Sequence, residues 1–110
     1  MKGFVKHHED TVLRDLGGGS SRRILAWNEK LMLVEVLFET GAEGKPHVHP
    51  HEQSSYVLSG KFRYMVDGES VELNPGDSIV VPGGLVHGTV CLEKGALLDT
   101  FTPCREDFLK

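Results

Sequence analysis

Short stretches in which apolar and polar residues alternate recur along this chain, and alternation with a period of two is typical of β-strands. The clearest stretch is residues 30–39, KLMLVEVLFE, where one set of alternate positions is uniformly apolar and the other mixes leucine with glutamate. The uniformly apolar set is Met32, Val34, Val36 and Phe38. We expect this set to face the interior of a barrel and the mixed face to lie outside, partly covered by a neighbouring subunit.

Further strands are expected where the alternation recurs, and turn-forming residues separate them. These stretches are residues 22–27, 61–66, 69–73, 78–81 and 96–103. Asp67-Gly68 is typical of a type I′ hairpin turn, and Asn74-Pro75-Gly76-Asp77 has the residues of a reverse turn. Strands of about five to eight residues with a turn about every 8–12 residues indicate an all-β sandwich or barrel. Only residues 105–110 suggest a short helical turn.

The first 21 residues are weakly patterned, and we expect them to form edge strands or an arm of a single domain covering residues 1–110. His7 and His8 are adjacent, so they would point to opposite faces of a strand, and we expect ordinary surface residues. Gly17 to Ser21, GGGSS, is expected to be a flexible turn. It is not read as a phosphate loop, because no Lys-Ser/Thr pair follows it.

Composition and charge exclude several classes of function. The 110 residues suffice for one domain, and the net charge of −4 includes no block of like charges, so nucleic-acid binding is not expected. No apolar run approaches the roughly 18 residues of a membrane span, and the N-terminus lacks the apolar core of a signal peptide. Cys91 and Cys104 form no C-x-x-C pair. We expect reduced thiols in a cytoplasmic protein, although a disulfide between them stays open.

Histidines at alternating positions form the candidate chemical centre. His47, His49 and His51 lie in the sequence HVHPH, and residues two apart in a strand point to the same face. His47 and His49 on one strand would aim two imidazoles at a common point, and imidazole is the commonest metal ligand. His87 and the amide oxygen of Gln53 are candidate further ligands. His51 follows a proline and is expected in a loop or at the rim. The alternative is that the histidines form one exposed face of a strand.

The spacing around these histidines resembles the two motifs of the cupin superfamily. Residues 41–60 read Gly41-x5-His47-x-His49-x3-Gln53-x6-Gly60, and residues 76–91 read Gly76-x5-Pro82-x-Gly84-x2-His87-x3-Cys91. The family has Glu at the position of Gln53 and Asn at that of Cys91. The resemblance implies a single-domain cupin, which is a double-stranded β-helix or jelly-roll-like barrel. It also implies one divalent transition metal ion (Zn, Ni, Mn or Fe) held by His47, His49, Gln53 and His87.

An acidic residue interrupts the last predicted strand. Asp99 lies inside residues 96–103, ALLDTFTP, which are otherwise largely apolar. A carboxylate buried without a partner is costly and has a raised pKa. If Asp99 faces the metal cavity, such a group suits general acid and base catalysis. The alternative is that it faces solvent or pairs with Arg22 or Arg23.

Two residues beside this aspartate are candidates for substrate binding. Arg105 either forms a surface ion pair with Glu106 or Asp107, or closes over the barrel mouth. In the second position its guanidinium would bind a substrate carboxylate through two parallel hydrogen bonds. Phe101 shares the face of Asp99, and it is either an ordinary core residue or an apolar wall for a sugar ring.

Shorter motifs narrow the resemblance to the small pectin-degradation cupins called KdgF. It rests on the stretches RRIL, HPHEQ, YVLSGKF, VCLEKGALLDTF and CREDF, and members of that family have Gln at the position of Gln53. The resemblance implies an enzyme that converts 4,5-unsaturated monouronates, released from pectin or alginate by lyases, into linear 5-keto-4-deoxyuronate by ring opening and ketonisation. It implies Asp99 and Arg105 as catalytic residues, with Phe101 and Arg105 binding this sugar acid.

Two other functions stay open at this point. A cupin dioxygenase using Fe(II) would commonly have two histidines and a carboxylate, whereas this chain has three histidines and an amide. A sugar-binding cupin without catalysis is expected if Asp99 and Arg105 face away from the metal. Whichever function holds, we expect a homodimer, because a neighbour's N-terminal strand can cap the mixed outer face of a small cupin barrel.

Overall fold

The computed structural model of the chain describes residues 1–110 and consists mostly of strands. Its elements, in chain order, are η1 (His8–Asp10), β1 (Leu13–Gly17), β2 (Ser20–Asn28), β3 (Leu31–Phe38), β4 (Glu43–His47), β5 (Glu52–Val66), β6 (Glu69–Leu73), β7 (Ser78–Val81), β8 (His87–Thr102) and η2 (Glu106–Leu109), where η denotes a short 3-10 helix. The prediction of an all-β fold is confirmed, and η2 is the helical turn expected at the C-terminus. Neither helix is long and apolar enough to cross a membrane.

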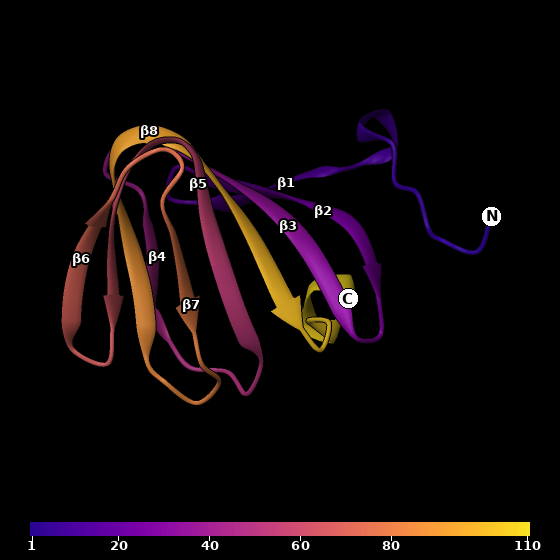
Figure 1. Cartoon of the computed structure of the whole chain (residues 1–110). Helices are drawn as coiled ribbons and strands as arrows, with labels where there is room; N and C mark the ends of the chain where they lie inside the picture. Colours follow the sequence, from indigo (N-terminus) through magenta and orange to yellow (C-terminus); the bar gives the residue numbers. More distant parts are fainter.

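The two longest strands, β5 and β8, organise the fold. They pair antiparallel from Glu52 opposite Thr102 to Val66 opposite His87. The C-terminal part of β8 also pairs with β3, whereas its N-terminal part pairs with β4. Similarly, β5 pairs with β7 along its first part and with β6 along its last part. All eight strands thus form one continuous sheet whose two halves share β5 and β8, and these two strands arch over the top of the molecule in Figure 1. This is the double-stranded β-helix that the motifs implied.

The bend between the two halves of the sheet lies at Gly60 in β5 and Gly95 in β8. A Cβ atom at Gly95 would overlap the carbonyl group of Ser59, and one at Gly60 would overlap the carbonyl oxygen of Glu93, so only glycine fits at this crossing. Shifts of register on both sides of Gly60 accommodate the bend. The strands predicted to begin just after these glycines are therefore too short, because both glycines lie inside continuous strands of 15 and 16 residues.

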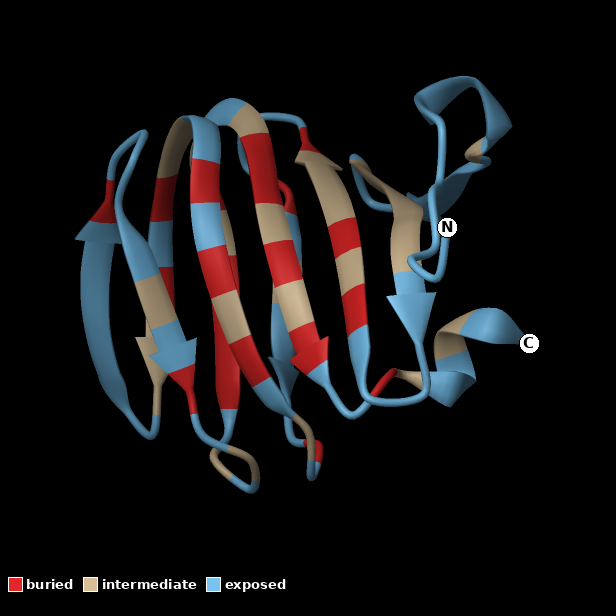
Figure 2. Cartoon of the chain, turned by 45° about the vertical axis from the view of Figure 1, so that its right-hand side comes forward, coloured by how far each residue is buried: buried red, intermediate tan, exposed pale blue.

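The inner face of the barrel consists of the alternate positions that the sequence pattern identified. In β3, Met32, Val34 and Phe38 are buried and Val36 is half-buried, as predicted. Figure 2 shows buried residues alternating with more exposed ones along the long strands. Several polar residues are also buried, namely His49, Gln53, Ser55, His87, Thr89 and Asp99. Because burying a polar group is costly unless it finds a partner, this set marks the candidate functional site.

The apolar core consists of two clusters. The larger comprises Phe38, Ala42, Val57, Phe62, Tyr64, Leu73, Val81, Cys91 and Leu97. The smaller comprises Met32, Val34, Phe101 and Cys104. Cys91 and Cys104 therefore lie in different clusters, and both are free thiols. The disulfide that the sequence left open is not formed.

The N-terminal segment lies at one edge of the sheet. β1 pairs with β2 and ends the strand order, and all its residues are exposed. Phe4 and Val5 lie outside any strand, so the edge strand expected in this segment begins only at Leu13. The exposed side chains of Leu13 and Leu16 leave this edge open to a neighbour. Pairing with a second copy of the chain stays a prediction.

Candidate metal centre and active site

Three histidines meet at one end of the barrel. His47 is the last residue of β4 and pairs with His87, the first residue of β8, while His49 lies in the following loop. One ring nitrogen from each lies within 4.8 Å of the others. His47 and His49 do not share a strand, contrary to the prediction from their alternation, because the chain leaves the sheet after His47. The Gly84 N–H donates to the carbonyl of His49 at 2.9 Å and holds this loop.

Backbone carbonyls determine the tautomer of each ring in the cluster. Nδ1 of His47 lies 2.8 Å from the carbonyl oxygen of Lys45, and Nδ1 of His87 lies 3.0 Å from that of Leu85. Nδ1 of His49 lies 3.0 Å from the carbonyl oxygen of His51. A carbonyl oxygen only accepts hydrogen bonds, so each Nδ1 carries the proton and each Nε2 keeps a free lone pair. This is the arrangement that orients imidazoles as metal ligands.

Gln53 directs its amide oxygen at the same point. Its Oε1 lies 3.0 Å from Nε2 of His49 and 3.2 Å from Nε2 of His87. Neither neutral ring has a proton on Nε2, so lone pairs face lone pairs in a buried space, and a cation between them removes this conflict. Ligand atoms about 2.1 Å from one ion lie about 3 Å apart when at right angles. The three histidines and Gln53 therefore fit a divalent metal ion, although the donor set does not identify the metal.

Burial keeps two of the histidines neutral. Desolvation is the largest effect on His49 and on His87, and it lowers the pKa of each below its ordinary value. The positive charge of Arg105 and the neighbouring histidines lower both pKa values further. Metal ligation requires the neutral ring, so these surroundings prepare the site for an ion near neutral pH.

The other histidines lie outside the cluster. His51 lies in the loop before β5, as expected, and its Nε2–H donates to the carbonyl of Cys104 at 3.2 Å. His7 and His8 are exposed in the N-terminal segment, also as expected. Only His47, His49 and His87 therefore gather in a group that can hold a metal.

Asp99 lies on the inner face of β8 and lines the same cavity as His47 and His87. Ser55 donates to its Oδ1 at 2.6 Å, and Asp99 forms no ion pair with Arg22 or with Arg23, which instead pairs with Glu35. Desolvation raises the pKa of Asp99 to about 6, although the Ser55 hydrogen bond and the charge of Arg105 oppose this shift. A carboxyl group with such a pKa can both take up and release a proton near neutral pH.

A hydrogen-bond network joins Asp99 to the metal centre. The Gln53 amide donates to Tyr64 Oη at 2.9 Å and to Ser55 Oγ at 3.2 Å. Tyr64 Oη and Ser55 Oγ lie 3.0 Å apart, and the Ser55 hydroxyl donates a hydrogen bond to Asp99 Oδ1. Sequence reasoning missed both residues. Ser55 shares the face of Gln53 two residues away, so that signal was present, but Tyr64 reaches the site only because β5 bends at Gly60.

One cavity of about 570 Å³ is lined by Asp99, Phe101 and Arg105 together with three of the four candidate metal ligands, His47, Gln53 and His87. Phe101 is buried and its ring lies 5.8 Å from that of His49, so it is both a core residue and part of the wall. Arg105 lines the cavity and also forms an ion pair: its Nε and Nη2 donate to the two carboxylate oxygens of Asp107 at 3.0 and 2.9 Å. The ion pair with Asp107 that the sequence offered as one alternative is therefore present, while binding of a substrate carboxylate by Arg105 stays a prediction.

The raised pKa of Asp99 predicts how this residue affects stability. In metal-free protein the folded state holds the Asp99 proton to a higher pH than the unfolded chain does, so the free energy of unfolding falls as the pH rises from about 4 to 6. Asp99→Asn removes this cost. We expect the variant to be more stable than the wild type by roughly 1–3 kcal/mol at neutral pH, and by much less near pH 4.

Urea unfolding of both metal-free proteins at about pH 4.5 and about pH 7.5 tests this expectation. A gain in stability that is the same at the two pH values would mean that Asp99 is not held in a desolvated state.

The fold and the histidine cluster together define a class of protein. A family model described as "Cupin domain" matches residues 34–100, which is more than half of the chain. The chain belongs to the cupin family, as its two motifs predicted.

Two relatives narrow the family further. The chain is 43% identical over 103 residues to the pectin degradation protein KdgF of Dickeya dadantii (strain 3937), a match that covers 92% of this chain and 94% of that protein. The structure of KdgF from a Halomonas species superposes with a TM-score of 0.90 at 38% identity and covers 97% of this chain and 99% of that one. Within the cupins, this chain is therefore a KdgF homologue.

A third comparison supports the same fold. An RmlC-like cupin from Shewanella frigidimarina NCIMB 400 superposes with a TM-score of 0.92 at 46% identity. The match covers 97% of this chain and 96% of that one. The agreement extends over nearly the whole chain, including the N-terminal segment that lies outside the matched family model.

Proposed function

We propose that this protein is a metal-dependent enzyme of pectin or alginate degradation. Its substrate is a 4,5-unsaturated monouronate, and its product is the linear 5-keto-4-deoxyuronate. The likeness to KdgF of Dickeya dadantii supports the general role. The observation that carries the reaction type is the position of Asp99, a buried carboxyl group with a pKa raised to about 6. It lines one cavity with His47 and His87, two members of the three-histidine cluster.

His47, His49, His87 and Gln53 would hold the metal. A divalent ion there would act as a Lewis acid on an oxygen atom of the substrate. Gln53 is held in place by Tyr64 and Ser55, so its amide oxygen stays directed at the histidines. A neutral amide ligand leaves one more positive charge on the site than glutamate would, which favours an anionic substrate.

Asp99 would move the one proton that the reaction relocates. The ionised carboxylate takes the proton from the anomeric hydroxyl group, and the bond between C1 and the ring oxygen breaks as C1 becomes an aldehyde. The resulting C5 enolate becomes a ketone when C4 receives a proton from Asp99. The product is an isomer of the substrate, so no oxidant, reductant or water is consumed. Ser55 donates to the ionised carboxylate and keeps it directed into the cavity.

Phe101 and Arg105 would position the sugar acid. Phe101 offers an apolar surface against which a sugar ring can lie. Arg105 adds a positive charge to the cavity, and its Nη1 takes no part in the ion pair with Asp107. Both residues contact substrate in this proposal, whereas Asp107 positions Arg105.

The two alternative functions have less support. Fe(II) sites that activate oxygen commonly contain a carboxylate ligand, and here Gln53 occupies that position. Sugar binding without catalysis does not require a desolvated carboxyl group in the cavity, and burying Asp99 there costs stability.

The proposed function is tested directly with the unsaturated monouronate that a pectate or alginate lyase releases. The ultraviolet absorbance of its conjugated double bond should disappear faster with metal-loaded protein than without protein. Protein treated with a chelator should lose this effect and regain it when a divalent metal is restored. Oxygen consumption in place of this isomerisation would support the dioxygenase, and no turnover with tight sugar binding would support the binding protein.

A further inference from the structure

A second arginine, Arg22, lines the cavity and has no acidic partner. Its guanidinium forms no ion pair, and its Nε is buried without a hydrogen-bond partner. The Arg22 guanidinium instead stacks on the ring of Phe108, with its Cζ 3.7 Å from the ring centroid. An arginine held in this way lacks the partners that normally compensate the cost of removing a charge from water.

The register of the sheet explains why Arg22 points inward. It lies on β2 opposite Val36 of β3, and Val36 lies opposite Leu97 of β8. Residues paired in this way share a face of the sheet, and both Val36 and Leu97 line the cavity. Arg22 therefore occupies an inner-face position that would normally be apolar. Its neighbour Arg23 points outward and pairs with Glu35 at 3.7 Å.

The charges around Arg22 are unfavourable for a purely structural residue. Desolvation lowers its pKa from the ordinary value, and the positive charges of Arg14 and Arg105 lower it further. Asp107 is the acidic residue that acts in the opposite direction, but both of its carboxylate oxygens already accept hydrogen bonds from Arg105. The arrangement leaves an excess of positive charge at this end of the cavity.

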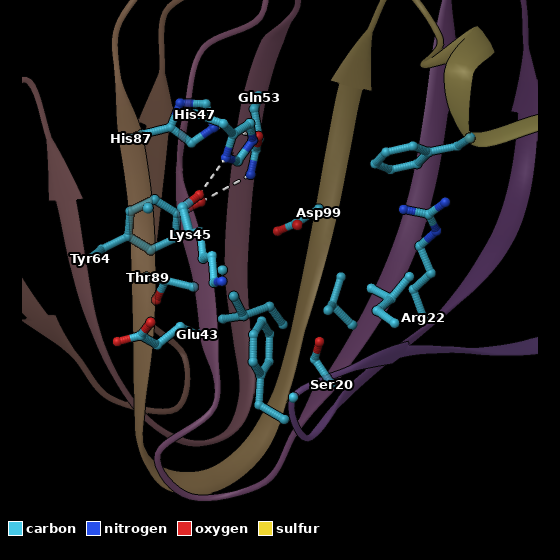
Figure 3. Close-up of a pocket in the computed structure, with 18 of the residues that line it drawn as sticks. Ser20, Arg22, Glu43, Lys45, His47, Gln53, Tyr64, His87, Thr89 and Asp99 are labelled. Carbon is cyan, nitrogen blue, oxygen red and sulfur yellow. Dashed lines mark hydrogen bonds between the residues drawn. The ribbon is translucent and has the colours of Figure 1, made fainter.

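Arg22 lies on the side of Asp99 away from the metal centre. The strands follow one another across the sheet as β2, β3, β8 and β5, so Arg22 on β2 and Gln53 on β5 lie on opposite sides of Asp99 on β8. Figure 3 shows this order, with Asp99 between the histidine cluster and Arg22. A molecule that reaches Asp99 from the metal centre therefore meets Arg22 next.

We propose that Arg22 binds the carboxylate of the sugar acid and selects uronates over neutral sugars. The free guanidinium can donate two parallel hydrogen bonds to a carboxylate, which no residue of the chain supplies. This inference rests on the proposed function for its substrate class, but it assigns a residue to recognition rather than to chemistry. The two arginines then have different roles. Arg22 binds the carboxylate, whereas Arg105, which is held by Asp107, adds positive charge beside it.

Binding of two saturated sugars tests the proposal apart from turnover. Galacturonate and galactose differ only in the carboxylate at C6, and neither has the double bond that the proposed reaction needs. With metal-loaded protein in a calorimetric titration, we expect galacturonate to bind more tightly than galactose. Arg22→Gln should weaken galacturonate binding about 10- to 100-fold and leave galactose binding unchanged. Arg22→Lys should retain part of the preference, because it keeps the charge but loses the paired donors.

Arg23→Gln is the matched control, since it removes a neighbouring arginine that faces outward, and it should bind both sugars like the wild type. Melting temperature separates recognition from structure: Arg22→Gln should melt at or above the wild-type temperature, because a half-buried charge without an acidic partner is removed. The proposal is overturned if Arg22→Gln keeps the wild-type preference, if the wild type shows no preference, or if only Arg105→Gln abolishes it. Each of these results can occur whether or not the unsaturated monouronate is turned over.

Discussion

Replacing Asp99 by Asn should lower kcat for the unsaturated monouronate by about 10²–10⁴-fold, the usual contribution of a positioned proton-transfer group. Asparagine has nearly the same shape and can still accept the hydrogen bond from Ser55, but it cannot carry a proton from the anomeric hydroxyl to C4. KM should change little, because in the proposed mechanism Asp99 acts on the reacting bonds, whereas Phe101 and the arginines bind the sugar. Initial rates of absorbance loss over a range of substrate concentrations measure both constants.

Two measurements make this result specific. Metal content should stay at the wild-type value in Asp99→Asn, because Asp99 is not among the residues whose ligand atoms converge. Glu35→Gln is a matched control, because it also removes one carboxylate from the sheet. Glu35 pairs with Arg23 outside the cavity, so the kcat of this variant should equal that of the wild type. Full activity in Asp99→Asn would mean that another group moves the proton.

Replacing His87 by Ala should remove the metal and, with it, nearly all turnover. His87 is almost fully buried, and its Nε2 lies 3.2 Å from Gln53 Oε1, so both atoms can bind one ion. Losing a residue that supports a metal ligand typically weakens metal binding about 10–100-fold, and losing a direct ligand should cost at least as much. We expect about one metal ion per chain in the wild type and far less in the variant, measured by elemental analysis after dialysis.

His51→Ala provides the matched comparison for this substitution. It removes a histidine next to the cluster whose Nε2 is bound to the carbonyl of Cys104, so metal content and turnover should be kept even if stability falls. Near-ultraviolet circular dichroism should show that His87→Ala remains folded. If His87→Ala retains one tightly bound ion per chain, the convergence of lone pairs described above is not a metal site.

The fold was predictable because most strands keep one side chain in two on the inner face. Met32, Val34 and Phe38 in β3 follow this rule, and the structure buries all three. The lengths of β5 and β8 were not predictable in the same way. Glycine normally indicates a break in a strand, but Gly60 and Gly95 here allow two strands to bend together without ending.

The candidate site was predictable in its residue types rather than in its connections. The three histidines are recognisable by spacing, although His49 reaches the cluster from a loop and not from the strand of His47. Ser55 could have been found from its place two residues after Gln53 on the same face, whereas Tyr64 carries no distinctive signal, because tyrosine is common in strands. Their hydrogen bonds to Gln53 exist only once β5 has bent and brought its two halves over one cavity.

By itself, the sequence determined the all-β class, the apolar inner face and the set of possible metal ligands, because alternation and spacing are local properties of the chain. Only the tertiary structure decided which charges have partners. Asp107 lies two residues from Arg105 and takes its Nε and Nη2, whereas Arg22, more than eighty positions earlier in the chain, shares the cavity without a carboxylate. That difference depends on long-range strand register, which brings distant residues to one face and which no short pattern records.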